Sequence, residues 1–260
     1  MTNYIKSEFY RILHTKGVFI LTGVCVAVAL SYVVLLWFMV SVEASTGGYF
    51  RWATTKHAFS TLEADMHIPL YLSAVMGSLI VCDDLKHRTI NNSVAFGMSR
   101  EQIFLAKVIV GMAVSAVCLV VTESVLIGSG YLLLEDSGAA YTLSLLKGTA
   151  ACIPAWTAGL IAIISLCYMT GNGSASIWSW MLIMVAAPAV VSILGMKFEF
   201  CERLASWLLY PLISTTVPTE EWLEYSWSTA AGFLKCQEAG VIGISVFITL
   251  GILAIRRREL

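Results

Sequence analysis

Long runs of apolar residues dominate the chain, and short polar stretches separate them. Crossing the roughly 30 Å hydrocarbon layer of a membrane takes about 20 apolar residues in a helix. Six windows approach or exceed that length. We therefore predict an all-α polytopic membrane protein, with residues 1–260 forming a single transmembrane domain. Its six transmembrane helices are predicted at Val18 to Val42, Met66 to Cys82, Val108 to Leu134, Gly148 to Met169, Ala175 to Met196 and Ala239 to Ile255.

Two further segments are predicted to lie at the membrane surface instead of crossing it. In residues 1–16, apolar side chains recur near helical spacing with basic residues between them, a pattern typical of an interfacial elbow helix. Residues 197–238 form a long loop between the fifth and sixth spans. Within this loop, Leu204 to Val217 is apolar but only about 14 residues long, and it contains Pro211. We predict a re-entrant outer segment there.

The positions of the basic residues favour one orientation. Cytoplasmic loops of membrane proteins carry an excess of Lys and Arg. With both termini inside, ten of the 16 basic residues fall on the cytoplasmic side. We therefore predict a multi-pass protein of the plasma membrane with both termini cytoplasmic. The ten residues are Lys6, Arg11, Lys16, Lys86, Arg88, Arg100, Lys107, Arg256, Arg257 and Arg258.

Composition supports the membrane prediction and excludes several classes of protein. Hydrophobic residues make up 58% of the chain and charged residues 13%, whereas a soluble domain carries about 25% charged residues. A cytosolic enzyme and a disordered chain are therefore excluded. The formal net charge is -1, so no positive excess exists to bind nucleic acid.

Known catalytic and ligand-binding patterns are missing from the sequence. The four histidines lie outside the predicted spans or at their edges, where they cannot activate a serine within the membrane. The chain contains neither HExxH nor GxxxxGK, and its seven cysteines form no CxxC. We predict no catalytic residue, no metal site and no cofactor in this chain.

Two places in the predicted spans are candidates for a transport path. Glu123 is the only carboxylate in a span, where a charged group costs at least about 2.5 kcal/mol. It either lines a polar path or makes a structural hydrogen bond to a neighbouring Ser or Thr. In the fifth span, Trp178, Met181 and Met184 either line a cavity for amphiphiles or pack against lipid and core. The sequence leaves both pairs of alternatives open.

The outer loop 197–238 combines glutamates with Trp and Tyr. Amphipathic aromatic side chains settle at headgroup depth, so plain anchoring is one interpretation. A gate or a cap that contacts substrate is the other. Cys201 and Cys236 are the two cysteines on the outer side, and an oxidising exterior would allow a disulfide between them.

The segment 83–107 reads DDLKHRTINNSVAFGMSREQIFLAK. It resembles the cytoplasmic loop of type 2 ABC-transporter permeases, which runs from an acidic residue through a Gly/Arg-Thr pair and a Gly-x-Ser-Arg turn to an Ala-Lys pair. The family usually has Glu where this chain has Asp84, and often Gly where it has Arg88. The matching positions are Asp84, Arg88, Thr89, Gly97, Ser99, Arg100, Ala106 and Lys107.

This resemblance implies the transmembrane subunit of an ABC exporter with a type V exporter-like fold. Such a permease pairs with a second half, identical or similar, and with two ATPase subunits that bind ATP and Mg²⁺. The segment 83–107 would carry the coupling helix that docks on the ATPase. Small permeases of this kind often export amphiphilic compounds, notably antimicrobial peptides in immunity or resistance. The implied coupling residues are Asp84, Lys86, Arg88, Thr89, Gly97, Ser99 and Arg100.

Two other functions compete with the ABC exporter permease. One is a self-sufficient carrier or channel, for which a single intramembrane carboxylate is thin support. The other is a non-transporting membrane scaffold or sensor. Stimulation of a separate ATPase by this chain would separate the first function from both alternatives.

Overall fold

The computed structural model describes residues 2–46, 54–87, 94–95, 97–214, 216–218 and 223–257. Within them, six helical segments are long and apolar enough to cross a membrane, which confirms the predicted number. The chain is therefore a helical, multi-pass membrane protein. The spanning segments are α2 (Lys16–Thr46), α4 (Ile68–His87), α6 (Arg100–Leu133), α7 (Ala139–Thr170), the consecutive α8, η1 and α9, and α12 (Ala230–Arg257).

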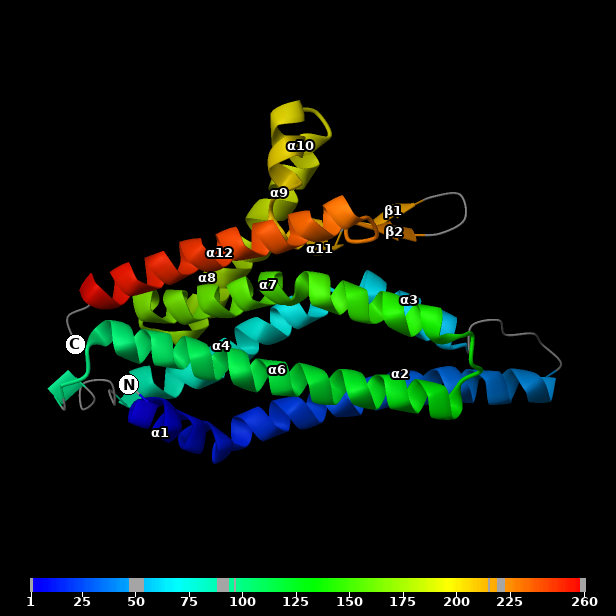
Figure 1. The fold of residues 1–260 in the computed structure, drawn as a ribbon, viewed down its shortest axis with the longest axis horizontal. Coiled ribbons are helices and arrows are strands. Elements are labelled where there is room, and N and C mark those ends of the chain that lie inside the picture. Colours follow the sequence, from blue (N-terminus) through cyan, green and yellow to red (C-terminus); the bar gives the residue numbers. More distant parts are fainter. Residues whose placement is uncertain are drawn as a thin grey trace.

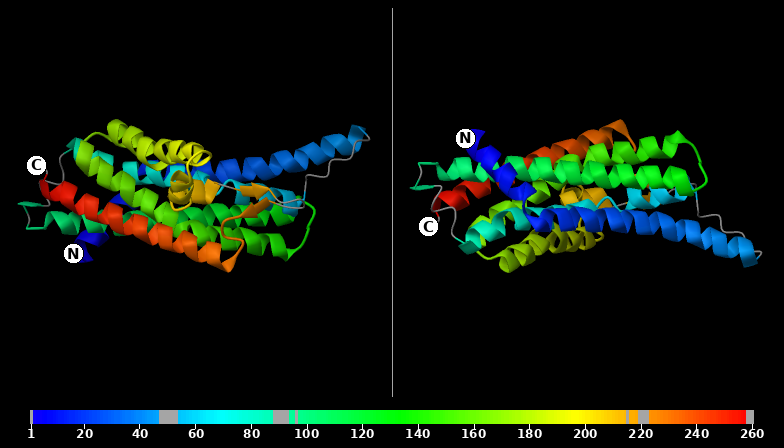
Figure 2. Two further views of the ribbon diagram at one scale, coloured as in Figure 1. Left: turned by 90° about the horizontal axis from the view of Figure 1, so that it is seen from above. Right: turned by 90° about the horizontal axis from the view of Figure 1, so that it is seen from below.

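Five of the described spanning helices run side by side along the long axis of the molecule (Figure 1). Both chain ends lie at one end of this bundle, together with the end of α4 and the start of α6, and we call it the terminal end. The short first helix, α1 (Thr2–Leu13), also lies there and packs on α6. Both views of Figure 2 show α2 reaching beyond its neighbours at the opposite end.

Three of the helices begin well before the predicted apolar windows. α6 begins at Arg100 instead of Val108, α7 at Ala139 instead of Gly148, and α12 at Ala230 instead of Ala239. Each predicted window ends at the nearest charged residue, whereas the helix continues through it. The second span likewise continues to His87, past the predicted end at Cys82.

The most buried spanning helix in the described part of the chain is α7, which packs mainly on α12 and α4. Small residues bring these helices close, as expected for membrane proteins. The Cα of Gly159 faces Leu70 and Ser73 of α4, and that of Gly240 on α12 lies against Pro154 of α7. The core of the bundle therefore forms around α7.

The fifth span is broken: its first half, α8, packs on α7 and α4, and its second half leaves the bundle. It consists of α8 (Gly173–Met181), the π-helical turn η1 (Leu182–Ala186) and α9 (Ala187–Gly195). Pro188 lies in the first turn of α9 and has no N–H to donate, and a widened turn accommodates such an interruption. The last part of the fifth span, α9, leans away from the other helices (Figure 1). In the most apolar 18-residue stretch of this span, only 17% of the residues are buried.

Short elements lie between the spanning helices. α3 (Thr55–Ala64) lies between the first and second spans, and α10 (Glu199–Ala205) and α11 (Leu209–Ser214) follow the fifth span. The described residues include one small antiparallel strand pair, β1 (Thr216–Pro218) and β2 (Leu223–Tyr225).

Two outer-loop aromatics fold into the molecule instead of spreading along a membrane surface. Trp227 is 1% exposed and donates its ring N–H to Glu63 at 3.0 Å. Its ring stacks on Tyr225, with centroids 5.1 Å apart. Burial, followed by the carboxylates of Glu63 and Asp65, raises the pKa of Tyr225 to about 12. The neutral phenol donates to the carbonyl of Ser60 at 3.0 Å.

Candidate functional site

Four charged side chains meet at the terminal end, where the connection between α4 and α6 is attached to the bundle. Two come from α1, one from α4 and one from α6. We call them the charge cluster: Glu8, Arg11, Asp84 and Lys107.

Each carboxylate of the charge cluster contacts both cations. Lys107 Nζ donates to Glu8 Oε2 at 2.5 Å and also to a carboxylate oxygen of Asp84. Arg11 donates through Nη2 to Glu8 Oε2 at 2.9 Å and through Nη1 to Asp84 Oδ1 at 2.5 Å. Arg11 also reaches the carbonyl of Ile80 at 3.0 Å. The contacts join α1, α4 and α6 at one point.

The charge cluster is almost closed to solvent. The side chain of Lys107 is 0% exposed, and those of Asp84 and Glu8 are 7% and 8% exposed, whereas Arg11 is 35% exposed. The fully buried ring of Tyr168 on α7 is an electrostatic neighbour of both carboxylates. Two acids and two bases leave the cluster formally neutral, as burial of charge requires.

The sequence of α1 explains why Glu8 points inward. Ile5, Glu8 and Ile12 are three and four residues apart, so they share one face of the helix. Glu8 and Ile12 are both buried. The apolar face of α1 therefore carries a carboxylate in its middle, and that carboxylate meets Lys107.

The start of α6 is fixed by local backbone chemistry. Gly97 has φ +85°, a conformation that favours glycine. Ser99 then caps α6: its hydroxyl accepts from the N–H of Gln102 at 3.3 Å, and the Gln102 side chain accepts from the N–H of Ser99. This reciprocal capping box fixes the first turn of α6.

A second set of contacts joins the start of α6 to the end of α12. Arg256 pairs with Glu101 at 2.5 Å, and Arg100 donates to the carbonyl of Arg256 at 3.4 Å. Both side chains of the ion pair are exposed, so its strength depends on salt. The basic C-terminal segment thus contacts the same helix as the charge cluster.

The predicted coupling residues are divided between an inner and an outer position. Asp84 is turned inward and buried among the cations, which removes it from the surface open to a partner. Lys86, Gly97 and Ser99 are exposed, and Arg100 is half-buried. Two further predicted residues, Arg88 and Thr89, lie outside the described residues.

The sequence did not single out Glu8, and Lys107 entered only as a cytoplasmic basic residue and as the last residue of the resemblance. One signal could have found them: Glu8 interrupts the apolar face of α1, and Lys107 is followed by the apolar run of the third span. A charge in such a place needs a partner of opposite sign.

The candidate transport-path residues do not meet in one place. Glu123 accepts a hydrogen bond from Thr149 of α7 at 2.7 Å, which matches the structural alternative, although the partner is on another helix. Trp178 is 76% exposed, whereas Met184 is buried and Met181 is half-buried. The fifth span therefore directs these side chains to different surroundings.

The proposed disulfide is not formed in the structure. Cys201 on α10 and Cys236 on α12 are both free thiols. Cys236 is buried and is an electrostatic neighbour of Cys152 on α7. Cys236 belongs to α12, and the packing of α12 on α7 turns its thiol into the bundle. It is therefore not on the outer side, where its predicted place in the loop 197–238 would have put it.

No group of three His, Cys, Asp or Glu side chains that could hold a metal occurs in the described part of the chain. The chain matches no protein-family model, and no curated protein is significantly similar to it.

Proposed function

We propose that this chain is the transmembrane permease subunit of an ABC exporter, driven by ATP hydrolysed on a separate partner subunit. The observation that carries the proposal is the charge cluster. It fastens α1, the end of α4 and the start of α6 to one another beside the segment that resembles the coupling loop.

A loop can transmit force to a bundle only if its attachment is stiff. Here Lys107 and Asp84 link the two helices that flank the loop, and Glu8 and Arg11 add α1 to the same unit. A push on the loop would therefore tilt three helices together. Rigid-body motion of this kind is a common way to alternate access between two faces of a membrane.

The finer features of the fold follow from the same proposal. α1 would lie in the cytoplasmic interface as the elbow helix, and α10 and α11 would form the re-entrant outer segment. Both termini would be cytoplasmic in the plasma membrane. A second permease half and two ATPase subunits carrying ATP and Mg²⁺ would complete the exporter, whose substrate would be an amphiphile such as an antimicrobial peptide.

The exposed part of the loop would form the docking surface. Lys86, next to the last residue of α4, is exposed and could meet an acidic groove. The test is co-purification of the chain with an ABC ATPase sought in the neighbouring reading frames. We expect the ATPase to co-purify and its ATP hydrolysis to rise severalfold in the presence of the chain. Lys86→Glu should weaken association about tenfold or more, because juxtaposed like charges cost several kcal/mol.

Arg257→Glu is the matched control, since Arg257 is exposed on α12 at the same end but outside the loop. This variant should retain association. Failure of the ATPase to associate with the wild-type chain would contradict the proposal. Substrate movement by the purified chain alone in vesicles would favour the self-sufficient carrier, and neither association nor movement would favour the scaffold.

A further inference from the structure

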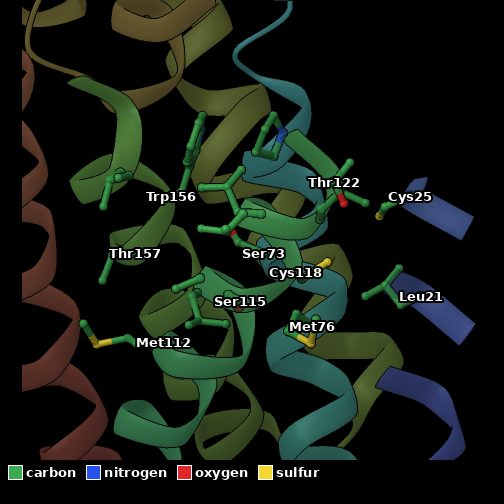
Figure 3. Close-up of a pocket in the computed structure, with 17 residues that line it drawn as sticks. Leu21, Cys25, Ser73, Met76, Met112, Ser115, Cys118, Thr122, Trp156 and Thr157 are labelled. Atoms are coloured by element: carbon green, nitrogen blue, oxygen red, sulfur yellow. The ribbon is translucent and has the colours of Figure 1, made fainter. Parts of the chain in front are cut away.

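A cavity of about 240 Å³ lies among α2, α4, α6 and α7. It forms because α2 packs chiefly on α6 while α4 packs chiefly on α7, which leaves space between the two pairs. Figure 3 shows the side chains that line it, including Cys25, Met76 and Trp156. Its lining is almost wholly apolar and includes no Asp, Glu, Lys or Arg.

Two hydroxyl groups in this lining have no hydrogen-bond partner among the described residues. They belong to Ser115 and Thr122 of α6, and both oxygens are buried. The residues are seven positions apart, two helical turns, so they share one face of α6 about 10 Å from each other. An unpaired hydroxyl in an apolar environment is unfavourable.

Other hydroxyls in the spans show how unusual this arrangement is. A Ser or Thr in a helix normally donates to the carbonyl one turn earlier. Thr22, Ser245 and Thr249 do so here, at 2.8 to 2.9 Å. Ser115 and Thr122 forgo that bond, which leaves each hydroxyl available to a molecule in the cavity.

We infer that the cavity binds a neutral lipid chain that carries an oxygen function, such as a long-chain alcohol. The apolar walls would hold the hydrocarbon, and the hydroxyl of either Ser115 or Thr122 would donate to its oxygen, because one oxygen cannot reach two hydroxyls about 10 Å apart. A charged headgroup is excluded, because no lining residue could pair with it. This site lies apart from the charge cluster, and it goes beyond the proposed coupling to an ATPase.

The cavity is large enough for a lipid chain but too small for the amphiphilic peptide proposed as the exported substrate. Pockets for drug-sized ligands occupy roughly 300–1,000 Å³, and this cavity is smaller. It therefore accommodates one chain or part of one, and not a folded peptide. Lipid from the surrounding bilayer is the nearest source of such a chain.

The test uses the purified full-length chain in detergent, without any ATPase, so its outcome does not depend on the proposed function. The probe is hexadecanol carrying a photoreactive diazirine, with unlabelled hexadecanol as competitor. Crosslinked residues are located by mass spectrometry of peptides. We expect saturable crosslinks on the facing stretches of α4, α6 and α7, and weaker competition by palmitate than by hexadecanol.

Two conservative variants test how much each hydroxyl contributes to hexadecanol binding, and each has a matched control on α12. One of the variants Ser115→Ala and Thr122→Val, the one whose hydroxyl holds the alcohol oxygen, should weaken hexadecanol binding about fivefold, the usual effect of one lost hydrogen bond, and the other should change it little. Ser245→Ala and Thr249→Val should leave it unchanged, since those hydroxyls already donate within their own helix. Ser115→Leu, which fills the cavity, should lower binding more than tenfold.

Thermal unfolding of each variant shows whether it is folded, and the Ala and Val variants remain informative if Ser115→Leu is not. Three results would overturn the inference. They are crosslinks confined to lipid-facing residues of the fifth span, crosslinking that unlabelled hexadecanol does not reduce, and binding that none of the cavity variants alters.

Discussion

Lys107 has the most demanding environment of the described charged residues, because no part of its side chain reaches solvent. An isolated buried ammonium is strongly destabilising, and only paired carboxylates with good geometry offset that cost. Glu8 and Asp84 provide two such carboxylates, and Arg11 balances the remaining charge. The four residues are therefore interdependent, and removal of one member affects the others.

Lys107→Met should destabilise the protein by about 3–5 kcal/mol, because it leaves two buried carboxylates with one half-exposed cation. The melting temperature in detergent measures the effect. Adding Glu8→Gln should recover part of the loss, since one of the two carboxylates is then neutral. Arg203→Met is the control: its pair with Glu199 is exposed at both ends, so it should cost less than about 0.5 kcal/mol. Equal losses in the two single variants would contradict a buried, interdependent cluster.

At the scale of elements, packing around α7 depends on where small residues face a neighbour. The spans contain several pairs of small residues at four-residue spacing, such as Ser124 with Gly128 and Ala155 with Gly159, and the structure uses them unequally. Gly159 is pressed against α4, whereas Gly128 has open space around it. Spacing alone shows that helices can approach closely. It does not show which helix approaches, because that depends on tertiary contacts.

Gly240→Ala should destabilise the contact between α12 and α7. A Cβ there would lie 2.4 Å from Pro154 Cβ and 2.8 Å from its carbonyl carbon, so the two helices must separate. Overpacking of this kind costs about 1–3 kcal/mol. Gly128→Ala makes the same change in open space within α6 and should be neutral or stabilising, because Ala favours helix more than Gly does. Melting temperatures that fall equally in both variants would refute the close approach.

For the whole molecule, hydrophobic length predicted the number of spanning helices, because burial in lipid depends on local composition. The turn between α7 and α8 was also predictable, since Gly171 adopts φ +72° there and Asn172 caps the next helix. The charge cluster was not, because it unites residues up to 99 positions apart in the chain. The burial of Trp227 was not predictable either, because its partner Glu63 lies between the first and second predicted spans, far away in the sequence.

Orientation is the property of the whole molecule on which the proposed coupling depends, and Cys201 can report it. If each of the six candidate spans crosses the membrane, five crossings separate α1 from α10, and Cys201 would lie on the side opposite the termini. The other six cysteines lie in the candidate spanning helices. With the termini cytoplasmic, as the excess of basic residues predicts, a membrane-impermeant maleimide should label the protein in intact cells. Cys201→Ser should lose the label. Labelling of Cys201 only in inverted vesicles would put the loop between α4 and α6 outside, where no cytoplasmic ATPase could reach it.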